Sequence, residues 1–284
     1  MKTSIIILTY NSEKYIKNLI ESITDANKSE EFEIIVVDND SDDKTVLEAK
    51  KFGDKIKIFE TGANLGFAKG INYGAQRSTG QYLLFINPDA VWSTGEIGNL
   101  ISVFEENEKI GIVGGRLVNN NGVSEKSAGK FMSFWGTVLL AFGLDEAFGI
   151  RMSPDKITRV DLVSGGFMMV KNEVFKKLDG FDENLFMYIE DMELCYRAKK
   201  LGFLTYFTPV ASIEHTGQGS SNRSFAVRNI FKGLLYFQKK HGNPLSYFLI
   251  KILLTAKAGM LVLIGKLLNN KYLVDTYADV ISWN

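Results

Sequence analysis

The feature that most constrains the fold is a regular alternation of short apolar runs with helix-like segments through the first half of the chain. The five apolar runs are predicted to be β-strands, at residues 4–8, 33–37, 55–59, 82–86 and 110–113. Between the first two runs, apolar side chains recur at helical spacing from Tyr15 to Ile23. Alternating strands and helices predict an α/β fold, with a mainly parallel sheet flanked by helices.

Composition narrows the class of protein. The 284 residues are 45% apolar, with 33 Lys and Arg against 33 Asp and Glu. A net charge of zero argues against a nucleic-acid partner, whose phosphates need a basic face. Cys195 is the single cysteine, so an internal disulfide is excluded and a reducing compartment is favoured. The apolar run at residues 5–8 is too short for a signal peptide, which predicts a cytoplasmic protein.

Two segments depart from the alternation. Residues 119–159 begin with the turn signal Asn119-Asn120-Asn121-Gly122 and are irregular, as expected of an insertion or a flap over a substrate. Residues 245–268 are mostly apolar but contain Lys251, Lys257 and Lys266. These lysines leave no uncharged run of about 18 residues, so a membrane-spanning helix is disfavoured. We expect residues 241–284 to form a helical tail on a membrane surface, on the domain or on a second subunit. One long helix and two short helices with a break near Gly259 are both compatible with the pattern.

Polar clusters follow the predicted strands, where parallel sheets bind ligands. Asp38, in Asp38-Asn39-Asp40, could accept a hydrogen bond from a nucleobase or a ribose, although Asp and Asn also favour helix starts. The segment from Asn64 to Gly74 contains glycines that could leave backbone N–H groups for an anion. It matches neither the phosphate-loop spacing nor the dinucleotide fingerprint, which counts against a hydride-transfer enzyme.

Two further clusters carry candidate metal ligands and a candidate base. Asp89, in the turn Asn87-Pro88-Asp89, could bind a hard cation through oxygen, and His215 is a possible second ligand. The neighbouring carboxylates Glu190 and Asp191 could supply a general base, because like charges raise a carboxyl pKa. Each cluster also has a structural explanation, as a turn, a packed histidine or an acidic helix start.

In the same segment, Glu193 and Arg197 are spaced as a structural ion pair, four positions apart.

Taken in order, these segments resemble the inverting glycosyltransferases of family 2, and especially their bacterial rhamnosyltransferase-like branch. The resemblance covers about residues 4–240 and implies the GT-A type of fold. The matching segments are Thr9-Tyr10-Asn11, Val37-Asp38-Asn39, Asn64-Leu65-Gly66-Phe67, Asn87-Pro88-Asp89, Gly165-Gly166-Phe167 and Glu190-Asp191. Residues 1–240 are therefore expected to form a nucleotide-sugar-dependent transferase domain.

The resemblance also implies roles for individual residues. Nucleotide-sugar binding is expected of Thr9, Tyr10, Asn11, Asp38, Asn64, Gly66, Phe67, Asn87 and Gly166. Asp89 and His215 are the expected ligands of a divalent cation, Mn²⁺ or Mg²⁺, and Asp191 is the expected base with Glu190 beside it. One departure is Asn87, which stands where the family's usual motif has its first aspartate and so removes one charge from the metal site.

The activity that the resemblance implies is transfer of a hexosyl or deoxyhexosyl unit, such as rhamnose, with inversion at the anomeric carbon. The expected donor is a nucleoside-diphosphate sugar, and the expected acceptor is a hydroxyl of a glycan or lipid-linked glycan in bacterial surface polysaccharide synthesis. Such an enzyme would work in the cytoplasm or at the inner face of the cell membrane, alone or as a homo-oligomer. Two alternatives remain open: a nucleotidyltransferase, and an inactive module that only binds nucleotide sugars.

Overall fold

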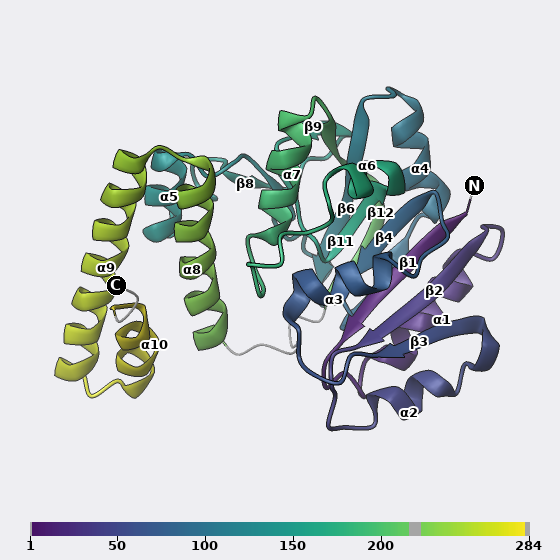
Figure 1. Cartoon of the computed structure of the whole chain (residues 1–284), viewed down its shortest axis with the longest axis horizontal. Helices are drawn as coiled ribbons and strands as arrows, with labels where there is room; N and C mark the ends of the chain where they lie inside the picture. Colours follow the sequence, from purple (N-terminus) through teal and green to yellow (C-terminus); the bar gives the residue numbers. More distant parts are fainter. Residues whose placement is uncertain (1, 216–222, 282–284) are drawn as a thin grey trace. The chain divides into compact units, whose positions relative to one another are not determined.

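The computed structural model describes residues 2–215 and 223–281, and it divides into two compact units (Figure 1). The first unit comprises Met1–Phe131, Arg151–Phe186 and Glu190–Ser220. The second comprises Met132–Ile150, Met187–Ile189 and Ser221–Asn284. The second unit thus includes Met132–Ile150 and begins its C-terminal part before residue 241. A functional boundary at residue 240 stays a prediction.

A nine-stranded sheet forms the centre of the first unit. Its strands are β1 (Thr3–Thr9), β2 (Phe32–Asp38), β3 (Ile56–Glu60), β4 (Tyr82–Ile86), β5 (Ala90–Thr94), β6 (Ile110–Asn119), β9 (Thr158–Val160), β11 (Phe167–Lys171) and β12 (Leu204–His215). The order is β3-β2-β1-β4-β11-β6-β12-β5, with β9 paired to β12. Six of these strands run in one direction, and β5, β9 and β11 run against them. The predicted mainly parallel α/β sheet is confirmed.

Helices cover both faces of this sheet (Figure 1). The helices of the first unit are α1 (Ile16–Ala26), α2 (Thr45–Lys50), α3 (Gly66–Ala75), α4 (Ile97–Glu105), α6 (Asn172–Lys177) and α7 (Glu190–Lys200), with a short 3₁₀ turn η1 at Gly53–Lys55. Ile5 and Ile7 of β1 join a core with α1 and α4, whereas Ile6 and Leu8 join a second core with α3, α6 and α7. Alternate side chains of one strand therefore lie in opposite cores, as the pleat of a strand requires. This is why the strands are apolar at nearly every position.

The region between β6 and β9 is divided between the units. A three-stranded sheet of β7 (Ala128–Gly129), β8 (Arg151–Met152) and β10 (Leu162–Val163) lies in the first unit. The turn predicted at residues 119–122 is present. The Gly122 N–H donates to the Asn119 carbonyl at 2.8 Å, and Gly122 has a φ of 72°. Helix α5 (Phe134–Ala141) belongs to the second unit. The role of residues 119–159 as an insertion or a flap over a substrate stays a prediction.

The second unit is helical. Besides α5 it contains α8 (Arg223–His241), α9 (Pro244–Leu267) and α10 (Lys271–Ile281). Its core includes Ile250, Leu254 and Ala258 of α9, together with Phe231 and Tyr277. Helix α9 is continuous through Gly259, so the arrangement with two short helices is wrong. An interior glycine costs only about 1 kcal/mol in a helix, which the packing of the flanking turns offsets.

In the described part of the chain, α9 is the helix long enough and apolar enough to cross a membrane by length and composition.

Candidate active site

The carboxyl ends of β1 and β2 hold a buried aspartate. Asp38 is 2% exposed, and its Oδ1 accepts hydrogen bonds from Thr9 Oγ1 at 2.9 Å and Ser41 Oγ at 2.6 Å. Its Oδ2 accepts from the Ser41 N–H at 2.9 Å. Three donors therefore fix the orientation of this carboxylate at the sheet edge. Ser41 had no role in the sequence-based prediction, although it lies three residues after Asp38.

The neighbouring loops brace this end of the sheet. The Asn11 N–H donates to Ser41 Oγ at 2.9 Å, and Asn11 Oδ1 accepts from the Asp42 N–H at 2.9 Å. Asn11 has a φ of 51°, a left-handed conformation that asparagine tolerates better than most residues. Tyr10 is half-buried, and its N–H lies 3.3 Å from Ser12 Oγ. The structure thus places the predicted residues Thr9, Tyr10 and Asn11 beside Asp38.

Asparagine side chains connect the end of β2 to the start of α3. Asn39 donates to Asn64 Oδ1 at 3.1 Å and to the Gly66 carbonyl at 3.2 Å. Gly66 has a φ of 78°, and a Cβ there would lie 2.4 Å from the Phe186 carbonyl oxygen. Only glycine fits both constraints. The Phe67 N–H donates to the same carbonyl at 2.6 Å, which joins the start of α3 to the loop before α7.

Gly165 and Gly166 contact the segments that contain Phe67, Asn87 and Asp191. A Cβ at Gly165 would lie 3.4 Å from the Phe67 ring, and the Gly165 N–H donates to Asp191 Oδ2 at 3.1 Å. The Asn87 N–H donates to the Gly166 carbonyl at 3.1 Å. A Cβ at Gly166 would come within 2.9 Å of the Asn87 side chain. The predicted residues Phe67, Asn87, Gly166 and Asp191 are therefore linked through the Gly165-Gly166 pair.

Glu190 and Asp191 open helix α7. Burial raises the pKa of Glu190 well above its ordinary value, and the charge of Asp191 raises it further. Burial also raises the pKa of Asp191, but hydrogen bonds from the N–H groups of Gly165 and Met192 oppose that rise. Glu190 Oε2 is buried and has no hydrogen-bond partner among the described residues. The negative charge of the pair is therefore favoured on Asp191.

The backbone just before α7 is strained. Tyr188 has a φ of 69° and Ile189 a φ of 71°, in the left-handed region. This is unusual for a β-branched residue such as isoleucine. Strain of this kind costs about 1–3 kcal/mol per residue and clusters at functional sites.

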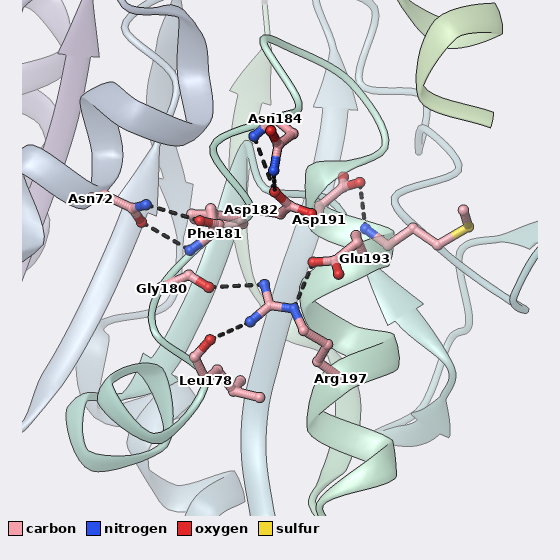
Figure 2. A network of polar contacts seen from close by, with 10 residues as sticks. Asn72, Leu178, Gly180, Phe181, Asp182, Asn184, Asp191, Glu193 and Arg197 are labelled. Atoms are coloured by element: carbon pink, nitrogen blue, oxygen red, sulfur yellow. Dashed lines mark hydrogen bonds and ion pairs between the residues drawn. The ribbon is translucent and has the colours of Figure 1, made fainter. Parts of the chain in front are cut away.

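Contacts behind Asp191 anchor α7 (Figure 2). Arg197 donates to Glu193 Oε2 at 2.7 Å and to the Gly180 carbonyl at 2.8 Å, and it also contacts the Leu178 carbonyl. The predicted pair of Glu193 and Arg197 is confirmed. Asn72 of α3 exchanges two hydrogen bonds with the backbone of Phe181, at 2.8 and 2.9 Å. The loop after α6 is thus tied to both α3 and α7, which positions the first turn of α7.

Asp89 and His215 lie close together, beyond the end of β4 and at the end of β12. Ala90, next to Asp89, pairs with His215 in the β5–β12 ladder. His215 Nε2 lies 3.3 Å from Asp89 Oδ2, and His215 Nδ1 lies 3.4 Å from Glu125 Oε2. The hydrogen bond to Asp89 is the main cause that raises the His215 pKa, and Glu125 adds to it. Glu125 was missed from the sequence because it lies in an irregular stretch without a motif.

The Asp89–His215 pair suits a divalent cation. Adjacent ligands of an octahedral ion, each about 2.1 Å from it, lie about 3 Å apart, which is close to the observed 3.3 Å. A carboxylate on the second nitrogen of a metal-binding histidine is a common supporting contact. Among the described residues there is no group of three or more His, Cys, Asp and Glu side chains arranged to hold a metal ion. Ligand oxygens would have to complete the coordination.

Residues 4–179, more than half of the chain, match the family model for glycosyl transferase family 2. The chain therefore belongs to this family, and it is a glycosyltransferase by class. It is 30% identical over 203 residues to the low-salt glycan biosynthesis hexosyltransferase Agl10 of Haloferax volcanii, covering 69% of this chain and 61% of that protein. It is 24% identical over 244 residues to the N-acetylglucosaminyl-diphospho-decaprenol L-rhamnosyltransferase of Mycobacterium tuberculosis, covering 77% of each chain. Rhamnosyltransferase WbbL of Escherichia coli is 27% identical over 239 residues, covering 78% of this chain and 85% of that protein.

Solved structures share the fold. GalNAc-T7 with UDP, GalNAc and Mn²⁺ matches with a TM-score of 0.60 at 16% identity, over 82% of this chain and 47% of that chain. TarS 1–349 of S. aureus matches with a TM-score of 0.56 at 17% identity, over 99% of this chain and 90% of that chain. These neighbours are GT-A-like, and the predicted GT-A type of fold is confirmed.

Proposed function

We propose that the chain transfers a hexosyl or deoxyhexosyl unit from a nucleoside-diphosphate sugar to a hydroxyl of a glycan or lipid-linked glycan. The observation that carries this proposal is that Asp38, Asp191 and the Asp89–His215 pair lie on segments at the same edge of the sheet. Contacts of Asn39 with Gly66, of Gly165 with Asp191 and of Gly166 with Asn87 connect these segments. A deoxythymidine-linked rhamnose is the favoured donor and a uridine-linked sugar the next. Two relatives named as rhamnosyltransferases support rhamnose as the transferred sugar. The expected setting is bacterial surface polysaccharide synthesis, in the cytoplasm or at the inner face of the membrane.

The donor would lie along the ends of β1, β2 and β4. Asp38, held by Thr9 and Ser41, is oriented to accept a hydrogen bond from the base or the ribose. Asn64 and Gly66 shape the path of the backbone at the start of α3. Asn87 follows β4 and lies against Gly166, and it would contact a sugar hydroxyl or a metal-bound water.

Asp191 is the proposed base, and the reaction is a single displacement. Its carboxylate takes the proton of the acceptor hydroxyl, and that oxygen attacks the anomeric carbon from the face opposite the diphosphate. The bond from the anomeric carbon to the diphosphate oxygen breaks, so the anomeric configuration inverts. Burial and the charge of Asp191 raise the pKa of Glu190, whereas backbone hydrogen bonds oppose the rise at Asp191. This difference favours the charge of the pair on Asp191 and suits one base.

Asp89 and His215 would hold a divalent cation, Mn²⁺ or Mg²⁺, together with diphosphate oxygens of the donor. Bound there, the ion supplies charge that stabilises the departing diphosphate. Glu125 Oε2 lies 3.4 Å from the other ring nitrogen of His215 and would support its orientation. The structural neighbour GalNAc-T7, which contains UDP and Mn²⁺, supports a metal in this fold. Asn87 contributes no charge, so Asp89 is the one carboxylate among the proposed metal ligands of the protein.

A thermal-shift screen across nucleotide sugars with Mn²⁺ tests the donor. A ligand at 100 times its dissociation constant adds about 2.7 kcal/mol of stability. We expect one nucleotide sugar to stabilise the protein and to be consumed when a hydroxyl acceptor is added. A stabilising sugar that is neither transferred nor hydrolysed would indicate an inactive binding module. Turnover of a nucleoside triphosphate and a sugar phosphate would indicate a nucleotidyltransferase.

A further inference from the structure

One side of α9 is apolar along its whole length and faces away from the core of its unit. Seven large apolar side chains there are 42–77% exposed; we call them the outer stripe: Leu245, Phe248, Leu249, Ile252, Met260, Leu263 and Leu267. At 100° per residue they fall within about 120° of the helix circumference. The buried residues Ile250, Leu254 and Ala258 lie on the opposite side. The stripe therefore has no partner within the described part of its own unit, and exposed apolar patches of this kind mark interaction sites.

The lysines of α9 are placed around this stripe, not inside it. Lys266 projects near one edge, and Lys251 projects about 60° beyond that edge. Lys257 projects on the other side, toward the packed face, where it donates to the Ala141 carbonyl of the same unit. Two lysines along one margin of an apolar stripe suit a helix in a membrane interface, because their long stems can carry the ammonium groups to the headgroups.

The formal charge of the second unit indicates what kind of partner covers the outer stripe. The second unit contains nine Lys and Arg residues against four Asp and Glu, a formal charge of +5. The first unit contains 24 against 29, a formal charge of −5. Two copies of a unit with charge +5 repel each other, whereas an anionic bilayer attracts each basic residue near its surface by about 1 kcal/mol. An anionic lipid surface thus fits the stripe and its surroundings better than a second copy of the chain does.

We propose that α9 lies in the interface of an anionic membrane, with the outer stripe among the acyl chains and Lys251 and Lys266 at the headgroups. The helix does not span the bilayer in this proposal, because its inner face packs against α5, α8 and α10. Its 24 residues give a helix about 36 Å long. The proposal is independent of the donor and acceptor, because membrane binding is measured without any substrate.

The first test uses the full chain with vesicles of phosphatidylcholine alone or mixed with phosphatidylglycerol, separated by sedimentation. We expect binding to the mixed vesicles, and binding at least about tenfold weaker when Leu245, Ile252 and Leu263 are replaced together by Gln. The matched control replaces Leu47 and Leu201, two exposed leucines of the first unit, by Gln and should bind as the parent does. Circular dichroism must give equal helix content for all three proteins. Absence of binding to mixed vesicles, or equal binding by the stripe variant, would overturn the proposal.

A second variant keeps the apolar side chains of the outer stripe and removes the charges of the two lysines along its margin. Lys251→Gln with Lys266→Gln should weaken binding to mixed vesicles several-fold and leave binding to pure phosphatidylcholine unchanged. Equal loss on both kinds of vesicle would contradict the headgroup role of the lysines. Light scattering without lipid supplies the remaining comparison. A dimer that the stripe variant dissociates, with no vesicle binding, would assign the stripe to a second copy and overturn the membrane assignment.

Discussion

The two units of this chain place polar and apolar groups in opposite ways. The first unit buries charged and polar side chains at its strand ends, such as Asp38, Asp89 and Glu190, and carries a formal charge of −5. The second unit carries +5 and leaves large apolar side chains exposed, from Phe248 to Leu267 along α9. A buried polar group is costly unless hydrogen bonds or a ligand satisfy it, and an exposed apolar stripe is unfavourable unless a partner covers it. The exposed stripe of the second unit therefore points to an apolar partner outside the chain, whereas the polar side chains of the first unit are held in place where a polar ligand is proposed.

The largest expected effect concerns the buried charge of the first unit. Asp191→Asn should lower kcat about a hundred- to ten-thousand-fold, as loss of a general base does, while the dissociation constant of the donor changes little. Steady-state kinetics and donor thermal shifts measure the two quantities separately. The matched variant Glu190→Gln should keep most of the activity, because Glu190 is expected to be neutral. An active Asp191→Asn with an inactive Glu190→Gln would move the base to Glu190.

The next effect compares the two faces of α9. Leu254→Ala removes a fully packed side chain of the second unit's core and should lower the free energy of unfolding by about 2–5 kcal/mol. Leu263→Gln, nine positions along and on the opposite face, should change it by less than about 0.5 kcal/mol. Urea unfolding of both variants measures the difference. A large loss for Leu263→Gln would mean that the outer stripe is packed within the protein.

A smaller expected effect tests whether Glu125 supports metal binding by contacting His215, a proposed metal ligand. Glu125→Gln should weaken Mn²⁺ binding in the presence of UDP about 10- to 100-fold, the usual cost of losing a supporting contact to a metal ligand. Manganese electron paramagnetic resonance measures this without turnover. Asp155→Asn, which alters an exposed carboxylate paired with Arg116, is the control and should have no effect. Unchanged affinity in Glu125→Gln would show that His215 does not depend on Glu125.

The smallest expected effect concerns Glu33, a carboxylate of the first unit whose pKa is lowered, in contrast to the raised pKa of Glu190. Burial of Glu33 favours its neutral form, but hydrogen bonds from Lys57, Ser4 and Thr79 outweigh burial and lower its pKa to about 2 from 4.5. The ionised form therefore stabilises the fold above pH 4.5, and that stabilisation is lost as the pH falls from 4.5 toward 2. Because the Lys57 partner is half exposed, Glu33→Gln should cost only about 1 kcal/mol at pH 7. Unfolding at pH 7 and pH 3 should show the difference shrink, and a constant difference would refute the assignment.

Much of the first unit could be predicted from the sequence because its strands are buried on both faces. Such strands appear as unbroken apolar runs, and each of the five predicted runs overlaps a strand of the sheet, β6 extending further to Asn119. The polar residues that follow them had to lie at one edge once the strands were parallel. The pair of Glu193 and Arg197 was visible for a similar reason, since both residues lie on one helix.

Glu125 and the composition of the second unit could not be read in this way. Glu125 contacts His215 across 90 positions of sequence, and a single carboxylate in an irregular stretch has no periodicity to reveal it. The apolar periodicity of α9 left its packed face undetermined, because both faces are apolar and only contacts with α5, α8 and α10 distinguish them. The zero net charge of the chain is likewise the sum of −5 and +5, and only the folded units separate the two values. Local patterns record which residues avoid water, so the sequence alone determined five strands of the sheet and their common direction; the antiparallel strands β5, β9 and β11 were not among them. Which distant residue covers each face depends on how the chain packs, and the tertiary structure alone decided that.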